Sequence, residues 1–293
     1  MPAAEVSVPP DLVRRLLAAQ QPDLAHLPIE PLAHGWDNVM YRLGGELAVR
    51  LPRRAVAARL IAHEQRWLPV LAPRLPLPVP APARAGRPAL GYPWPWSIVP
   101  FLPGRLATRE PPADPAAAAA SLGGFLGALH APAPADAPAN PLRGIPLAER
   151  AAVVTENLSV LGGLVDRGAV TRVWRAALAT PAWDGAPVWL HGDLHPANIL
   201  VHRGSISGVI DFGDITAGDP ATDLSVAWML LPAGCHGAFR DAYRAAGGPA
   251  AGGGSWARAR GWALALSLAC LANSADNPLI AAMGRRTLGA VLG

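Results

Sequence analysis

The chain contains no lysine, and all 25 of its basic residues are arginine. Together with abundant alanine, glycine and proline, this bias is typical of a GC-rich coding sequence. The 30 glycines and 33 prolines are therefore not taken as a sign of disorder, and a hydrophobic fraction of 51% supports a folded chain. A length of 293 residues allows one large domain or two lobes with a real core.

Cysteine is also scarce. Cys235 and Cys270 form no CxxC pair, which argues against a disulfide framework and against a structural zinc module. The N-terminus lacks a charged start followed by an apolar run, so no signal peptide is expected. The longest apolar stretch, residues 262–272, is too short to span a bilayer. We therefore expect a cytoplasmic protein with no membrane partner.

Basic patches and the common glycine-rich nucleotide motifs are missing as well. The formal net charge is +4, and the arginines are scattered without a stripe of interleaved aromatic residues. Nucleic acid is therefore not expected as a partner. No GxxxxGK[ST] sequence occurs, and no GxGxxG covers the first predicted hairpin. The sequence leaves the oligomeric state open.

The most informative segment is residues 191–214, where HGDLHPANIL is followed by VIDFGD. The residues between Asn198 and Asp211 predict a β-hairpin with a turn at residues 203–205. The start of one strand and the end of its antiparallel partner lie at the same edge, so Asn198 and Asp211 are expected close together. An amide oxygen and a carboxylate that converge in this way suit a hard cation such as Mg²⁺.

Asp193 stands five residues before Asn198, on the loop that enters the same edge. There it would be free to accept the proton of a hydroxyl beside a metal ion, as magnesium-dependent phosphoryl transfer requires. The alternative is that these polar residues are turn formers and caps at loop ends.

The spacing of Asp193, Asn198 and Asp211 resembles the catalytic loop and metal-binding segment of the protein-kinase superfold. HGD, HPANIL after it and IDFGDITAGDPATDL downstream resemble more specifically the aminoglycoside phosphotransferase family and its small-molecule kinase relatives, over residues 189–224. The resemblance implies that Asp193 is the catalytic base or a hydroxyl-orienting carboxylate. It also implies that Asn198 and Asp211 bind Mg²⁺, and that Asp223 supports the catalytic loop from below.

His191 and His195 are four residues apart, a spacing that a zinc site on a helix would use. Gly192 and Pro196 argue against that helix, and no HExxH sequence is present. We therefore expect His191 to brace the catalytic loop through hydrogen bonds, as the family pattern implies, and His195 to serve only in loop packing.

The pattern along the chain fits an α+β, protein-kinase-like fold of two lobes. A small antiparallel-sheet lobe with a helix and a hinge is expected in residues 1–104, and a mostly helical lobe in residues 105–293. In the first lobe we expect a helix from Asp11, strands at 29–33, 39–43, 47–51, 79–84 and 96–101, a helix at 56–71 and a hinge at 102–104. In the second lobe we expect a helix over 122–129, another that begins at 219–220, and a connecting loop at 131–146.

The predicted helix 56–71 carries Glu64 on its apolar face, where a carboxylate must be paired to offset the cost of burial. In the kinase superfold a basic residue on the third strand meets a glutamate on the next helix and holds the nucleotide phosphates. The resemblance maps this pair onto Arg50 and Glu64. Arginine replaces the common lysine, so phosphate contact should persist with altered geometry. Otherwise Arg50 lies in solvent at a strand end, and Arg53 is a second candidate.

The remaining nucleotide contacts follow from position alone. Residues 34–38 would cover the nucleotide, as the resemblance suggests, and their single glycine is a weak signal. In the hinge, the carbonyl of Pro100 and the amide of Leu102 would face adenine. Pro100 cannot donate a hydrogen bond, but Leu102 can.

The expected function is ATP-dependent transfer of the γ-phosphate to a hydroxyl of a small-molecule acceptor, an antibiotic being one candidate, with ATP and Mg²⁺ as cofactors. The alternative is a kinase-fold nucleotide-binding protein without transferase activity, which Arg50 favours. A protein kinase fits poorly, because Asp211 and Asp223 are too close to hold a long activation loop and no APE sequence follows.

The composition of the C-terminal helices bears on the acceptor. From residue 224 to the end there are two acidic residues against six arginines, whereas a polycationic acceptor needs several carboxylates. We therefore expect a neutral or weakly charged hydroxylated acceptor and poor transfer to aminoglycosides. Trp228, Trp256 and Trp262 are either core residues or the lining of an aromatic acceptor pocket. Three earlier residues could still supply an acidic patch: Glu149, Glu156 and Asp184.

Overall fold

The computed structural model describes residues 3–35, 37–249 and 252–293. Trp36, in the predicted nucleotide-covering loop, lies outside these residues. The chain divides into two compact units. Unit 1 comprises residues 1–73, 78–102 and 211–213, and unit 2 comprises residues 74–77, 103–210 and 214–293.

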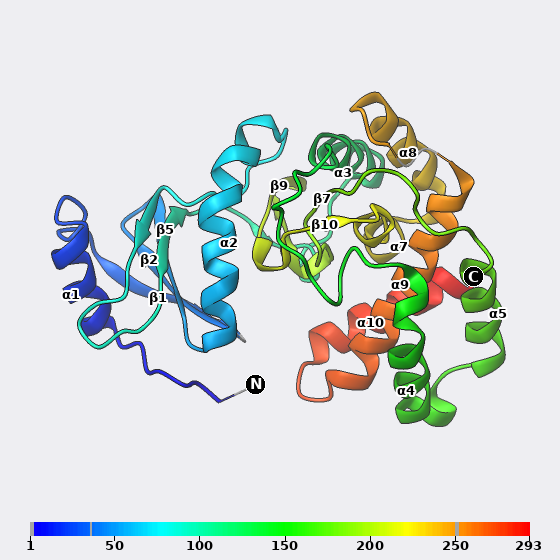
Figure 1. The fold of residues 1–293 in the computed structure, drawn as a ribbon, viewed down its shortest axis with the longest axis horizontal. Helices are drawn as coiled ribbons and strands as arrows, with labels where there is room; N and C mark the ends of the chain where they lie inside the picture. The colour runs from blue at the N-terminus through cyan, green and yellow to red at the C-terminus, as the bar shows by residue number, and fades with distance from the viewer. Residues whose placement is uncertain (1–2, 36, 250–251) are drawn as a thin grey trace. The chain divides into compact units, whose positions relative to one another are not determined.

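Unit 1 is built on a five-stranded antiparallel sheet with the strand order β1-β2-β3-β5-β4. Figure 1 labels β1, β2 and β5 of this sheet. The strands are β1 (Ile29–His34), β2 (Asn38–Leu43), β3 (Leu47–Pro52), β4 (Arg84–Gly86) and β5 (Trp96–Pro100). The predicted strand at 79–84 is wrong, because β4 begins only at Arg84. Three prolines in the segment before it lack the N–H that strand pairing needs: Pro78, Pro80 and Pro82. The other predicted strands are confirmed.

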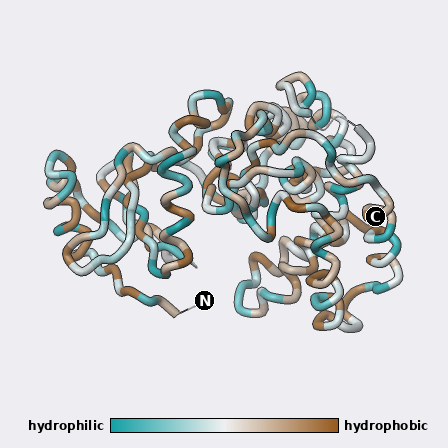
Figure 2. The backbone as a smooth tube through the Cα atoms, viewed as in Figure 1, coloured by the Kyte–Doolittle hydropathy of each residue, from teal (hydrophilic) through white to brown (hydrophobic). Residues whose placement is uncertain are grey.

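Two helices pack on the sheet of unit 1. α1 (Pro10–Gln20) buries Leu16 and Leu17 in a core that includes Val49 and Leu51 of β3. α2 (Ala55–Leu71) contacts β3 and β5, and hydrophobic and hydrophilic residues alternate along it (Figure 2). Successive side chains of a strand point to opposite faces. Arg50, between Val49 and Leu51, therefore faces α2, on the side of the sheet away from the α1 core.

Unit 2 is mostly helical, with short strands near the predicted catalytic loop (Figure 1). Its helices are α3 (Pro115–Leu129), α4 (Ala151–Leu161), α5 (Arg167–Leu178), α6 (Ala221–Leu224), α7 (Val226–Leu230), α8 (His236–Ala245), α9 (Gly253–Asn273) and α10 (Pro278–Leu292). Its strands are β6 (Arg105–Leu106), β7 (Val188–Leu190), β8 (Ile199–His202), β9 (Ser205–Val209) and β10 (Thr216–Gly218). Residues 131–146 contain no helix and no strand, as expected of a connecting loop.

The predicted helix after Pro220 is two short helices rather than one. α6 ends at Leu224 and α7 begins at Val226. The hydroxyl of Ser225, between them, donates a hydrogen bond to the carbonyl of Thr222 at 2.6 Å, a local bond that competes with helical pairing.

α9 forms the centre of unit 2. It contacts α4, α5, α6 and α10, and most of its side chains are buried. Its length does not make it a membrane span: across the described part of the chain, every helix is too short or too polar to cross a bilayer.

Candidate active site

The hairpin of the HPANIL segment is confirmed. Its strands β8 and β9 pair antiparallel, with Ile199 opposite Val209, and the turn residues Arg203 and Gly204 both have positive φ, 51° and 79°. Turns of this kind match the twist of the flanking strands. The register brings the backbone of Asn198 beside Ile210, whose N–H donates to the Asn198 carbonyl at 2.9 Å. Asp211 follows Ile210 directly in the chain.

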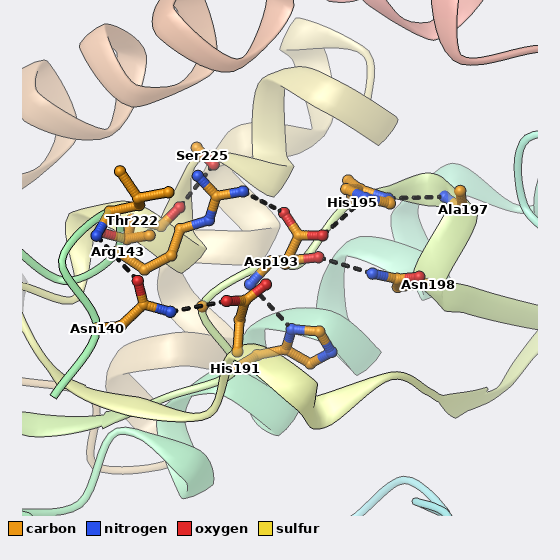
Figure 3. Close-up of polar contacts among 12 residues, drawn as sticks. Asn140, Arg143, His191, Asp193, His195, Ala197, Asn198, Thr222 and Ser225 are labelled. Carbon is orange, nitrogen blue, oxygen red and sulfur yellow. Dashed lines mark hydrogen bonds and ion pairs between the residues drawn. The ribbon is translucent and has the colours of Figure 1, made fainter. Parts of the chain in front are cut away.

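Asp193 is held by two basic side chains (Figure 3). Arg143 Nη2 donates to Oδ1 at 2.7 Å, and His195 Nε2 lies 3.3 Å from Oδ2. Burial alone would raise the pKa of the Asp193 carboxyl, but His195, Arg143 and His191 together lower it well below its usual range. Asp193 is therefore a carboxylate with a fixed orientation at neutral pH. The expectation that His195 serves only in packing is wrong.

The ring orientations of the two histidines follow from their partners. The N–H of Asp193 donates to His191 Nδ1, which leaves the proton on Nε2, 3.0 Å from the carbonyl of Ile210. The N–H of Ala197 donates to His195 Nδ1, so His195 Nε2 carries the proton that faces Asp193. His191 thus ties the catalytic loop to the end of β9, which confirms its predicted bracing role.

Asn198 is oriented by the same loop. Its Nδ2 donates to the carbonyl of Asp193 at 2.9 Å (Figure 3). Because the amide nitrogen is committed in this way, the side-chain oxygen Oδ1 is the atom left to bind a cation.

Asp223 of α6 supports this loop, whereas Asp219, just before α6, has other partners. Asp223 is buried and accepts hydrogen bonds from the backbone N–H groups of His191 and Gly192, at 2.7 and 2.9 Å, which confirms its supporting role. Asp219 accepts from the N–H of Ala221, as a cap would, and also forms a buried ion pair with Arg258 of α9 at 2.7 Å.

Gly192 is required by the backbone of the HGD segment. Its φ is +86°, and a Cβ atom there would overlap the carbonyl oxygen of Asp214. Only glycine meets both conditions without strain. The glycine therefore allows the catalytic loop and the segment after Asp211 to pack together.

In unit 1, the predicted pair of Arg50 and Glu64 is confirmed. Arg50 Nη1 donates to both carboxylate oxygens of Glu64, at 2.6 and 2.8 Å, and Nη2 donates to Asp211 Oδ1 at 2.8 Å. Burial opposes the charge of Arg50, but the two carboxylates raise its pKa above the usual value. Arg50 is thus a permanent cation between two carboxylates. The alternative placement of Arg50 in solvent is wrong.

Asp211 itself has an unusual backbone conformation. Its φ is +64°, a region that aspartate tolerates better than most residues. Its side chain is 54% exposed, with one oxygen bound to Arg50. The other oxygen is available to a ligand.

The hinge residues lie at the end of the sheet of unit 1. Pro100 pairs with Leu47 in β3, and the N–H of Phe101 donates to the carbonyl of Glu46 at 2.8 Å. Within the described residues, the N–H of Leu102 has no protein acceptor. This is the arrangement that a base-facing amide requires.

Arg143 is the main residue that sequence reasoning missed. It lies in the proline-rich connecting loop, fifty residues before its partner Asp193, and no periodicity or motif singles it out. Asn140 of the same loop donates to Asp214 Oδ1 at 2.7 Å, so the loop is bound to both sides of the catalytic segment.

The chain is similar to known proteins in sequence and in fold. The model of the phosphotransferase enzyme family matches residues 28–262. The structure of the GDP complex of aminoglycoside 2'-phosphotransferase-IIIa is 19% identical, with a TM-score of 0.68 over 95% of this chain and 97% of that chain. Macrolide 2'-phosphotransferase MphH from Brachybacterium faecium, as the apoenzyme, is 25% identical, with a TM-score of 0.60 over 96% and 97% of the two chains.

A further similar structure is the streptomycin–ATP ternary complex of APH(2")-IIa, 16% identical, with a TM-score of 0.59 over 98% of this chain and 99% of that chain. No curated protein matches the chain. The structural similarities confirm the expected α+β, kinase-like fold, and the family model covers most of the sequence. The chain belongs to the phosphotransferase enzyme family and is a small-molecule phosphotransferase.

Proposed function

We propose that the protein transfers the γ-phosphate of ATP to a hydroxyl of a small molecule, with Asp193 as the catalytic residue. The observation that carries this proposal is the setting of Asp193, a carboxylate held at both oxygens on a loop that Asp223 and His191 brace. Preorganised charge of this kind acts on a reacting group without reorganisation during the reaction.

Asp193 acts mainly by orientation. A carboxylate whose pKa is well below the usual range is a weak base, so it accepts the hydroxyl proton only late in the transfer. The acceptor oxygen forms the new bond to the γ-phosphorus as the bond from that phosphorus to the bridging oxygen of ADP breaks. Asp193 directs the hydroxyl in line with this displacement.

The side chains of Asn198 and Asp211 fit Mg²⁺. Each offers one oxygen, because Asn198 Nδ2 is bound to the Asp193 carbonyl and one oxygen of Asp211 is bound to Arg50. Hard cations prefer such oxygens, and Mg²⁺ commonly takes one or two protein ligands together with phosphate oxygens and water. The ion would offset negative charge on the nucleotide phosphates.

ATP is the proposed phosphate donor, with Arg50 near its phosphates, Glu64 holding Arg50, and Pro100 and Leu102 at the base. Similar structures contain GDP, ADP or ATP, so both guanine and adenine nucleotides bind to proteins with this fold. The adenine assignment rests on the Pro100 carbonyl and the Leu102 amide. A site that uses cytosolic ATP also supports a cytoplasmic location.

The similar proteins indicate the general class of the acceptor. Complexes of that fold contain kanamycin, streptomycin and gentamicin, and others are macrolide phosphotransferases. A hydroxylated small molecule is therefore proposed, with antibiotics among the candidates.

A second candidate is a nucleotide-binding protein without transferase activity. The contact of Arg50 with Asp211 favours it, since a guanidinium on a metal-binding carboxylate competes with the metal. We expect binding of the nucleotide to displace Arg50 from Asp211 and leave it on Glu64.

The test is a screen for nucleotide consumption with purified protein, ATP or GTP, Mg²⁺ and a panel of aminoglycosides, macrolides and hydroxylated metabolites. Phosphorylated products are identified by mass spectrometry, with Asp193→Asn as the control. Product formation in the parent protein and not in the variant supports transfer. Tight nucleotide binding with no product from any acceptor supports the second candidate.

A further inference from the structure

Unit 2 contains buried N–H donors without acceptors. Within the described residues, the buried side-chain nitrogens that lack a hydrogen-bond partner include Arg143 Nε, Arg150 Nε, Asn157 Nδ2 and Trp262 Nε1. All four are donors. Buried donors without partners are rare because each forfeits its hydrogen bonds to water, so these donors indicate an acceptor that the protein itself does not supply.

Arg150 is the most unusual member. It ends the short 3₁₀ turn Leu147–Arg150, which leads into α4, and it is only 6% exposed. Its guanidinium lies 5.8 Å from the ring centre of Trp262 on α9. In the part of the chain that the structure describes, no carboxylate pairs with Arg150 and none of its nitrogens donates a hydrogen bond. Nη1 and Nη2, unlike Nε, are not fully buried.

Arg143 and Arg150 are close enough to repel each other. Burial lowers the pKa of Arg150, and the charge of Arg143 lowers it further. The charges of Asp193 and Asp214 offset that of Arg143, so among the described residues no nearby carboxylate remains to offset the charge of Arg150. Placing a second cation beside one that already contacts the catalytic carboxylate is unfavourable in the free protein.

The acidic residues of this region do not neutralise Arg150. Arg150 and Asn157 lie seven residues apart, which is two turns of a continuous helical stretch, and both are buried. Glu149 and Glu156 each precede one of them, about 100° around the helix, and are exposed. The acidic patch that these two residues could have supplied for a cationic acceptor therefore does not face the Arg150 side.

We infer that Arg143 and Arg150 form a subsite for an anionic group of the acceptor, so that the hydroxylated substrate carries a carboxylate or a phosphate. The inference rests on the proposed function for the position of Asp193 beside the acceptor hydroxyl. Arg143 Nη2 touches Asp193 at 2.7 Å, so an anion on these arginines lies next to the reacting hydroxyl. This inference replaces the neutral acceptor expected from the sequence with an anionic one, and it agrees with that expectation in disfavouring polycations.

The first test needs no knowledge of the acceptor. Thermal unfolding is measured with ADP and Mg²⁺ at saturation, so that the nucleotide-phosphate site is already filled, and at constant ionic strength set with sodium chloride. Gluconate, citrate and inorganic phosphate are the anionic probes, and glucose and glycerol the neutral ones. We expect at least one anion to raise the Tm of the parent protein by about 2–4 °C, and the neutral probes to have no effect.

Arg150→Met keeps the length of the side chain and removes the charge. We expect this variant to lose the response to anions and, without ligand, to have an unchanged or higher Tm, because an unpaired buried cation is removed. A structural arginine would instead lower the Tm on substitution. The matched control is Arg240→Met: Arg240 also lies over a tryptophan, Trp256 at 4.4 Å, and also has an unpartnered Nε, but on α8. Its response to anions should stay intact.

The second test compares acceptors that differ in one group: gluconate with glucose, pantothenate with panthenol, and shikimate with its methyl ester. Preferred transfer to the anionic members, with KM raised about tenfold or more in Arg150→Met and little changed in Arg240→Met, supports the subsite. Efficient transfer to neutral or cationic acceptors alone overturns it and leaves the proposed transferase function standing. If no acceptor is phosphorylated, the transferase function fails. The anion response of Tm then still decides the subsite, and its absence for every anion overturns it.

Discussion

The two ion-pair clusters of the molecule have opposite signs. In unit 1 a cation, Arg50, is enclosed by two carboxylates, Glu64 and Asp211. In unit 2 a carboxylate, Asp193, is enclosed by Arg143 and His195. The side chains of Arg50 and Glu64 are 9% and 4% exposed, whereas those of Arg143 and Asp193 are 16% and 27% exposed.

This difference in exposure separates a cluster that stabilises the fold from a cluster that a reactant can reach. A buried ion pair stabilises little in itself, but removing one partner is costly because the other charge is left without solvent. A partly exposed pair lets water replace the lost partner. The cluster of unit 1 therefore stabilises the packing of α2 on the sheet, and the cluster of unit 2 contains the carboxylate that we propose to face the acceptor.

Removal of the presented carboxylate should give the largest effect on function. Asp193→Asn keeps the shape and one acceptor oxygen, so we expect normal folding and ATP binding. Phosphoryl transfer should fall by roughly two to four orders of magnitude, because the variant neither orients the hydroxyl as a carboxylate does nor accepts its proton late in the transfer. Steady-state kinetics and calorimetry of ATP binding measure the two properties. Near-normal turnover would contradict the assignment of Asp193.

Removing the cation of the cluster in unit 1 should give the largest effect on stability. Arg50→Ala leaves Glu64 buried without the cation that pairs with it, and we expect the free energy of unfolding to fall by about 3–5 kcal/mol, with most transfer activity lost. Arg50→Lys should retain measurable activity, since it keeps the charge. Arg143→Met, in the open cluster, should cost less than about 1 kcal/mol. Denaturant unfolding compares them.

The double variant Arg50→Met/Glu64→Met is the control for this comparison. It removes both charges, so it should recover much of the stability that Arg50→Ala loses. Equal losses for Arg50→Ala and Arg143→Met would show that burial does not distinguish the clusters.

The two proposed magnesium ligands, Asp211 and Asn198, differ in charge. Asp211→Ala removes a carboxylate and should weaken magnesium-nucleotide binding on the order of tenfold or more. Asn198→Ala removes a neutral oxygen and should weaken it less. Calorimetric titration with ADP at fixed Mg²⁺ measures both, and unchanged affinity in Asp211→Ala would rule out its role.

The smallest expected effect concerns pH. Arg143 is one of the groups that lower the pKa of Asp193, so Arg143→Met should raise that pKa. The loss of kcat/KM on acidification reports protonation of the essential carboxylate in the free enzyme and should therefore begin at a higher pH than in the parent protein. Near pH 8 Asp193 stays ionised in both proteins. An acidic limb that does not move would show that Arg143 does not control this carboxylate.

The parts of the site that could be predicted are those with a local cause. The hairpin between Asn198 and Asp211 follows from its turn and its apolar strands. The position of Glu64 on the apolar face of α2 shows that this carboxylate needs a partner, and the resemblance to the kinase superfold identifies that partner as Arg50. The predicted strand at 79–84 is wrong because three prolines in this segment cannot donate the hydrogen bonds of a strand, although its apolar residues alternate as in one. The role of His195 was underestimated because its partner depends on how the loop turns.

By itself, the sequence determined the order of elements, the hairpin that follows Asp193 and Asn198, and the need of Glu64 for a partner. Turn chemistry, side-chain periodicity and the cost of burying a charge act over a few residues, so they can be read along the chain. Only the tertiary structure decided that Arg143 contacts Asp193 and that Arg150 lies over Trp262 without a counter-ion. These contacts join segments fifty or more residues apart. Their energy depends on how much hydration each charged group loses on burial, and only the folded chain fixes that burial.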